Sequence, residues 1–149
     1  MPRSTPMKSL TVLSRDWKCE LAALVKSAQT QIIISSPYLT SQGSAFILAN
    51  LRKRVAPKIK LRVLTDLSPT NVCQGATDPA AIRTLWHAVA DFTLLHLPRL
   101  HAKVYVGDFR CAIVTSANLT AGGLGRNYEY GIRVSEHRFV KDIADDIRD

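Results

Sequence analysis

The chain has 149 residues, 46% hydrophobic and 21% charged, a composition that is typical of one globular domain and excludes a disordered or fibrous protein. Its 20 Lys and Arg against 12 Asp and Glu give a net charge of +8, which favours a polyanionic partner such as nucleic acid or an anionic membrane surface. No apolar stretch approaches the ~20 residues of a membrane-spanning helix, and no secretion signal follows the N-terminus, so we expect a cytoplasmic protein.

Helical and strand patterns alternate in the first half of the chain. Apolar periodicity and β-branched runs predict a helix over 16–29, a strand over 31–35, a helix over 44–56, a strand over 59–66 and a helix over 78–90. Pro37 ends the first strand because it lacks a backbone donor, and Asp78-Pro79 suits the start of the last helix. This alternation is typical of a βαβ-type layered sheet.

The second half contains closely spaced strands, which we expect to pair as hairpins. They are predicted over 92–97, 102–106, 111–115 and 128–134, and a helix follows from the spacing of Phe139, Val140, Ile143 and Ile147. Several strands have apolar residues at both odd and even positions, which is typical of central strands covered on both faces. The predicted fold class is therefore α/β, with a mixed β-sheet covered by helices on both faces. No stop signal precedes Asp149, so we expect the natural protein to continue beyond it.

Cysteine and histidine spacing gives no sign of a metal site. Cys19, Cys73 and Cys111 are odd in number and lack CxxC spacing, so we interpret them as small buried hydrophobes rather than disulfide or zinc ligands. His87, His96 and His137 lack ligand-like spacing and are interpreted as structural or surface residues. We expect no metal and no cofactor.

A group of polar residues between positions 101 and 131 has the pattern of a site. The group consists of His101, Lys103, Asp108, Ser116, Asn118 and Glu129. Side chains alternate along a strand, so His101 and Lys103 are expected on one face while Ala102, Val104 and Val106 enter the opposite packing layer. The same parity places Ser116 and Asn118 together at the end of the next strand, and Glu129 opposite Tyr128 and Tyr130. Each residue alone could be an ordinary polar residue, but together they favour a site.

Cleavage of a phosphodiester requires a nucleophile, a proton donor for the leaving oxygen, and donors to the non-bridging oxygens. A neutral imidazole can attack phosphorus, and a carboxylate that accepts its other N–H stabilises the ring as it becomes cationic. We assign these roles to His101 and Glu129. Lys103 and Asn118 are predicted to bind the phosphate oxygens, with Ser116 as a weaker donor.

The segment HAKVYVGDFRCAIVTSAN resembles the HKD motif of the phospholipase D superfamily, HxK(x)4D(x)6GSxN. The departure is Thr115, where the family more often has glycine, and a bulkier residue is expected to crowd the strand end there. The resemblance implies a phospholipase D-like fold for a single domain over 1–149 and the same roles for His101, Lys103, Ser116, Asn118 and Glu129. It also implies a structural role for Asp108, in a turn after the strand.

Enzymes of the superfamily use two HKD motifs per active site, one His attacking and the other acting as general acid. This chain has one motif, so the resemblance implies a homodimer. It is similar to small bacterial phospholipase D-like nucleases and to restriction- or helicase-associated nuclease domains. We therefore expect a metal-independent endonuclease that cleaves DNA through a covalent phosphohistidine intermediate, without a membrane partner and with further domains after Asp149.

Two other functions stay open. A non-catalytic nucleic-acid-binding module would have the basic surface without needing the polar group, and a phospholipid-cleaving phospholipase D is usually longer and carries both motifs. Three weaker features could also bear on function. AGGLG at 121–125 is interpreted as a flexible turn near the site, and Tyr38 as a structural or site-lining residue. The basic cluster, defined as Arg52, Lys53, Arg54, Lys58 and Lys60, either follows a nucleic-acid backbone or is an ordinary solvated surface.

Overall fold

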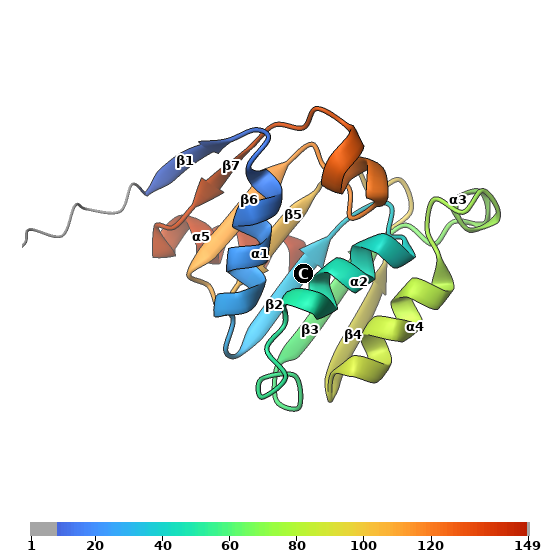
Figure 1. Cartoon of the computed structure of the whole chain (residues 1–149), viewed down its shortest axis with the longest axis horizontal. Coiled ribbons are helices and arrows are strands. Elements are labelled where there is room, and N and C mark those ends of the chain that lie inside the picture. Colours follow the sequence, from blue (N-terminus) through green and yellow to red (C-terminus); the bar gives the residue numbers. More distant parts are fainter. Residues whose placement is uncertain (1–8, 149) are drawn as a thin grey trace, which may run out of the picture.

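The computed structural model describes residues 9–148, and within them seven strands form one mixed sheet in the order β1-β7-β6-β5-β2-β3-β4 (Figure 1). Helices lie on both of its faces, which confirms the predicted α/β class. The first eight residues, where we looked for a secretion signal, and Asp149 lie outside the described residues. Within the described part of the chain, no helix has the length and apolar character needed to cross a bilayer.

The strands are β1 (Leu10–Leu13), β2 (Gln31–Ser35), β3 (Lys60–Thr65), β4 (Asp91–His96), β5 (Val104–Gly107), β6 (Cys111–Thr115) and β7 (Gly131–Val134). The helices are α1 (Trp17–Ser27), α2 (Ser41–Asn50), α3 (Pro69–Cys73), α4 (Pro79–Ala88), α5 (His137–Arg148) and the π-helical turn η1 (Gly122–Arg126). β2, β3 and β4 are parallel, whereas β5, β6, β7 and β1 continue from β2 by antiparallel pairing. The hairpins predicted for the second half are thus confirmed for β5–β6 and β6–β7.

Alternation along the central strands supplies apolar residues to both faces of the sheet. Ile32 and Ile34 of β2 belong to the larger core layer, with residues of α1, α2 and α4, while Ile33 belongs to the smaller layer under α5. On the α5 side, Val140 and Ala144 join the cluster that contains the β-branched residues of β5. Full burial of one such side chain contributes about 1.5–3 kcal/mol. The two layers therefore hold β5 and β2, which carry residues next to the site, firmly in the middle of the sheet.

Several boundaries differ from the sequence-based expectation. α2 begins at Ser41 and ends at Asn50, whereas we predicted 44–56. It ends early because Leu51 is extended (φ −74°, ψ 127°) and Pro57 disfavours helix in the residue before it. β1 and α3 were not predicted. β5 and β7 begin later than expected, at Val104 and Gly131.

The interpretation of the cysteines as buried is wrong for two of the three. Cys19 and Cys73 are exposed and Cys111 is half-buried, and all three are free thiols. Cys19 is two positions after the buried Trp17 on α1, which turns it away from the core. Burial raises the pKa of the Cys111 thiol.

Candidate active site

The polar residues of the motif, except Asp108, lie in segments that meet at one edge of the sheet. β2 and β6 end at this edge, and β5 and β7 begin there because each is antiparallel to its neighbours. In Figure 1 the orange-red turn η1 lies above the same edge. Topology therefore brings the segments around His101, Ser116 and Glu129 together, although 28 positions separate the first from the last in the numbering.

His101 and Lys103 contact each other directly before β5. Lys103 Nζ lies 3.3 Å from Nε2 and 3.4 Å from Nδ1 of the His101 ring, and it donates to the His101 carbonyl at 2.9 Å. His101 is exposed, whereas Lys103 is only 8% exposed. Burial lowers the pKa of the Lys103 ammonium, and the negative charge of Glu129 partly opposes that effect. A desolvated cation next to an accessible imidazole can bind an anionic substrate strongly.

The expectation that the strand begins at Ala102 is wrong, as is the strand geometry expected for His101 and Lys103. The segment precedes β5, and Ala102 is exposed rather than packed. It is nevertheless fixed to the sheet edge, because the Ser35 hydroxyl donates to the Ala102 carbonyl at 2.9 Å and the Thr115 N–H donates to the Lys103 carbonyl at 3.1 Å. The predicted parity holds further along, where Val104 and Val106 enter the layer under α5.

The carboxylate of Glu129 accepts hydrogen bonds from two nearby side chains. The Ser116 hydroxyl donates to Glu129 Oε2, and Asn127 Nδ2 donates to Oε1 at 3.2 Å. Ser116 is fixed in turn because its Oγ accepts from the Tyr130 N–H at 3.1 Å and its own N–H donates to the Tyr130 carbonyl at 2.9 Å. Across residues 9–148 no hydrogen bond joins Glu129 to His101, so the expected direct contact is not present in this chain.

The role of Asn127 was missed by the sequence reasoning. It is two positions before Glu129 in NYEY, but nothing in its spacing distinguishes it from a loop asparagine. Tyr128 and Tyr130, which we expected on the apolar side of a strand, are 71% and 54% exposed. This difference arises because β7 begins only at Gly131, so residues 128–130 extend beyond the sheet.

Asn118 has unused hydrogen-bonding capacity near this edge. Its Oδ1 is buried and has no partner among the described residues. Its main chain is in close contact with η1, because a Cβ added at Gly123 would lie 2.0 Å from the Asn118 carbonyl oxygen. The unpaired Oδ1 is an acceptor, as is a phosphate oxygen, so this atom does not itself bind a phosphate. The phosphate-binding role predicted for Asn118 would use its Nδ2–H donors.

Asp108 lies at the other end of β5, away from His101. Its carboxylate accepts hydrogen bonds from the N–H groups of Gln29, Thr30 and Gln31 at 2.7, 2.8 and 3.0 Å and from the Thr30 hydroxyl at 2.8 Å. Burial opposes ionisation, but these donors outweigh it and lower the pKa of the Asp108 carboxyl. Asp108 thus fixes the start of β2, in agreement with the supporting role expected from the turn.

The structure also gives the positions of the three weaker sequence features, which are the basic cluster, AGGLG and Tyr38. The basic cluster lies around the start of β3, at the sheet edge opposite His101, so it does not line the site. AGGLG forms most of η1 rather than a flexible turn. Tyr38 is 39% exposed just after β2, and its carbonyl accepts from the Ser36 hydroxyl at 2.6 Å.

Within residues 9–148, no three His, Cys, Asp or Glu side chains are grouped to hold a metal ion.

Comparison with protein families gives one match that covers most of the chain. Residues 21–149 match the family described as cardiolipin synthase, PLD-like domain. The matched range includes every residue of the predicted site. Comparison with curated protein sequences gave no match.

Solved structures with the same fold include two bacterial proteins of similar length. NucT from Helicobacter pylori has a TM-score of 0.71 at 15% identity over 91% of each chain. Nuc, a phospholipase D family member from Salmonella typhimurium, has a TM-score of 0.71 at 17% identity over 92% of this chain and 90% of that one. Phosphatidylserine synthase from Haemophilus influenzae has a TM-score of 0.76 at 17% identity over 95% of this chain but 37% of that one. At these identities the likeness shows the fold alone.

Proposed function

The chain belongs to the phospholipase D superfamily, and on this premise we propose that it is a phosphodiesterase whose nucleophile is His101. The observation that carries the proposal is the contact between the exposed His101 ring and the Nζ atom of the largely buried Lys103, 3.3 Å from Nε2. An accessible imidazole beside a desolvated cation suits attack on a phosphorus atom whose oxygens are negatively charged.

The proposed reaction has two steps. A ring nitrogen of His101 attacks phosphorus, the bond from phosphorus to the leaving oxygen breaks, and a general acid protonates that oxygen. Water then cleaves the phosphorus–nitrogen bond and releases the imidazole. Lys103 and Asn118 stabilise negative charge on the non-bridging oxygens, a role that metal ions fill in two-metal nucleases. We therefore propose a reaction that does not require a metal.

Glu129 and Ser116 have supporting parts in this mechanism. Because Ser116 and Asn127 bond both carboxylate oxygens, Glu129 presents a fixed negative charge that interacts with Lys103. We propose that this charge also stabilises the imidazolium that forms as His101 attacks. Ser116 acts by orienting Glu129, in addition to any bond with the phosphate.

The site of one chain is incomplete for this mechanism. One HKD motif supplies one imidazole, whereas attack and protonation of the leaving oxygen call for two. We propose a homodimer in which two His101 side chains face each other across the twofold axis. The phosphate would then lie between two copies of His101, Lys103 and Asn118.

We propose nucleic acid as the substrate, with endonucleolytic cleavage of DNA as the reaction. The net charge of +8 supports a polyanion. The main alternative is a phospholipid, a substrate with the same phosphodiester linkage. A non-catalytic nucleic-acid-binding module is the second alternative, and the buried Lys103 against His101 argues against it because a phosphate-binding surface does not need a desolvated cation.

One assay separates these functions. The protein is incubated in EDTA with plasmid, single-stranded DNA, RNA, bis(p-nitrophenyl) phosphate and phospholipid vesicles, beside the His101→Ala variant. We expect wild-type protein to cleave bis(p-nitrophenyl) phosphate and DNA in EDTA, and the variant to cleave neither while keeping its fold and its affinity for DNA. Cleavage only after addition of a divalent metal, or equal activity of His101→Ala, would contradict the mechanism. Cleavage of lipid alone would contradict the substrate.

A further inference from the structure

A groove of about 380 Å³ opens beside Glu129, between the start of α1 and residues 123–129. Its lining includes Arg15, Trp17, Gly123, Arg126, Asn127, Tyr128 and Glu129. Glu129 and Asn127 belong both to this lining and to the candidate site, so the groove adjoins the site at these two residues.

The walls of the groove are joined by buried contacts. The indole of Trp17, 3% exposed, donates from Nε1 to the Gly123 carbonyl at 3.0 Å, and its ring lies 5.8 Å from that of Tyr105 in the core. Gly123 in turn touches the Asn118 main chain. The groove is therefore formed by the folded chain before any ligand arrives, and its shape is linked to the phosphate-binding Asn118.

Two arginines give the groove a positive charge. Arg15 and Arg126 line it and are exposed, and among residues 9–148 neither takes part in an ion pair. Glu129 is the acidic residue in the lining, and both of its oxygens are already bonded to Ser116 and Asn127. Unpaired guanidinium groups at the margin of a groove suit phosphate groups, which they bind in a bidentate manner.

Tyr128 adds an aromatic surface next to these charges. It is 71% exposed, which leaves a large ring in water beside the two arginines. A nucleobase can stack on such a ring only if it is unpaired, because the faces of a paired base are covered by its neighbours in the duplex. Positive groups that follow the backbone together with an aromatic platform are typical of single-strand binding.

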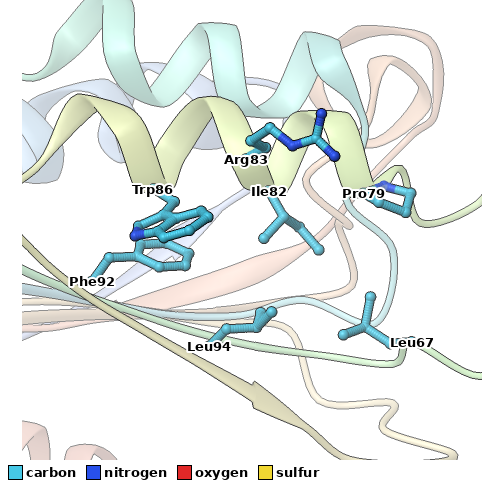
Figure 2. Close-up of a pocket in the computed structure, with 7 residues that line it drawn as sticks. All are labelled: Leu67, Pro79, Ile82, Arg83, Trp86, Phe92 and Leu94. Atoms are coloured by element: carbon cyan, nitrogen blue, oxygen red, sulfur yellow. The ribbon is translucent and has the colours of Figure 1, made fainter.

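The apolar groove elsewhere on the molecule has a different character. It has a volume of about 410 Å³, lies between α4 and β4, and has Arg83 as the charged residue in a lining of Leu67, Pro79, Ile82, Trp86, Phe92 and Leu94. In Figure 2 the Trp86 ring lies beside Phe92 over this groove. Trp86 is 57% exposed, so it provides a matched exposed aromatic residue outside the proposed binding surface.

From these observations we infer that the groove binds the segment of a single-stranded polynucleotide that flanks the scissile phosphate. Arg15 and Arg126 bind backbone phosphates, and Tyr128 stacks on one unpaired base. The inference rests on the proposed function, because it places the flanking strand relative to a phosphate at His101. It predicts a preference for single strands over duplexes, which the charge of the protein alone does not.

The test is binding of a fluorescent oligonucleotide, single-stranded or duplex, to the His101→Ala protein, followed by anisotropy at several salt concentrations. Tyr128→Leu should weaken single-strand binding about tenfold and change duplex binding little, whereas Tyr128→Phe should bind as the parent does. Arg15→Gln combined with Arg126→Gln should reduce the slope of log affinity against log salt by about 1.4, since each phosphate contact contributes about 0.7 for a single strand.

Two matched controls keep the test specific. Trp86→Leu removes an exposed aromatic ring from the other groove, and Arg54→Gln with Lys58→Gln removes two exposed charges at the opposite edge of the sheet. Neither should alter single-strand affinity or its salt slope as the groove variants do. Equal losses in the controls, or equal losses for single strand and duplex with Tyr128→Leu, would overturn the inference. Binding of this kind by a protein that cleaves no phosphodiester would overturn the proposed function and leave the groove assignment standing.

Discussion

Thr115 and Gly131 lie directly opposite each other on β6 and β7. A Cβ added at Gly131 would be 2.8 Å from the Thr115 Cβ and 2.5 Å from the Val114 carbonyl oxygen. Thr115 therefore has room because its partner has no side chain, and its hydroxyl donates to the Tyr130 carbonyl at 3.1 Å and accepts from the Ala117 N–H at 3.2 Å. The expectation that threonine crowds the strand end is wrong for this reason.

Gly131→Ala should destabilise the protein by about 1–3 kcal/mol, the usual cost of adding atoms to a filled site. The clash involves the Val114 main chain, which cannot move without disturbing the pairing of β6. Urea unfolding monitored by circular dichroism measures the change. Gly125→Ala is the matched control, because nothing lies within 4 Å of a Cβ at that position. Equal stability of the two variants would contradict the packing described.

Asp108→Asn should lower the free energy of unfolding by about 1–3 kcal/mol at neutral pH, because four donors lose their charged acceptor. The folded protein lowers the pKa of this carboxyl, so its stabilising effect is complete above the unfolded-state pKa of about 4 and is lost as pH falls toward the folded-state pKa. The difference between wild type and variant should therefore shrink below about pH 4. Unfolding curves from pH 7 to pH 3 test this, and a constant difference would speak against a charge effect.

The pH dependence of turnover should report the ionisation of Lys103. Burial lowers the pKa of this ammonium, so activity should decline on the alkaline side at a lower pH than an ordinary lysine would give. Glu129→Gln removes the anion that opposes this effect, and we expect it to reduce turnover and to move the alkaline decline to still lower pH. The measurement is the pH–rate profile for bis(p-nitrophenyl) phosphate. A decline that stays in place or moves to higher pH would separate Glu129 from Lys103.

Mixed dimers test the shared site. When wild-type chains are refolded with a large excess of His101→Ala chains, nearly every wild-type chain has a partner without an imidazole. Activity per wild-type chain should then collapse, because the leaving oxygen loses its proton donor. Subunit exchange is verified with a size tag on one chain type. Constant activity per wild-type chain across the mixing series would mean that each chain holds a complete site.

Sequence patterns were most reliable where a boundary depends on nearby residues. β2 and β6 have the predicted bounds, and Pro37 follows soon after the first of them. β5 is shorter than predicted because its neighbour β2 ends at Ser35, which pairs with Val104 and leaves residues 101–103 without a strand beside them on that side. The length of a strand depends on its partners, and alternation along one segment does not contain that information.

Contacts within the site also depend on how neighbouring strands are arranged. The motif spacing predicted the contact of His101 with Lys103 and the place of Ser116, but the bond from Asn127 to Glu129 depends on how residues 127–130 leave the sheet. The position of the basic cluster relative to the site could not be deduced from the sequence, because it depends on the strand order. The cluster lies around the start of β3, whereas the site lies beyond the end of the parallel β2.

Lys103 and Asp108 mark the two ends of β5, whose four residues Val104–Gly107 are the four between them in the motif. The four residues between Lys103 and Asp108 in the motif therefore correspond to the length of β5. Deleting one residue would shorten this strand by about 3.3 Å. It would also turn the side chains on one side of the deletion to the opposite face of the sheet, which would remove Tyr105 from the layer it shares with Trp17. Homologous chains should accordingly vary in the identity of these four residues and keep their number, with insertions and deletions confined to the turns on either side.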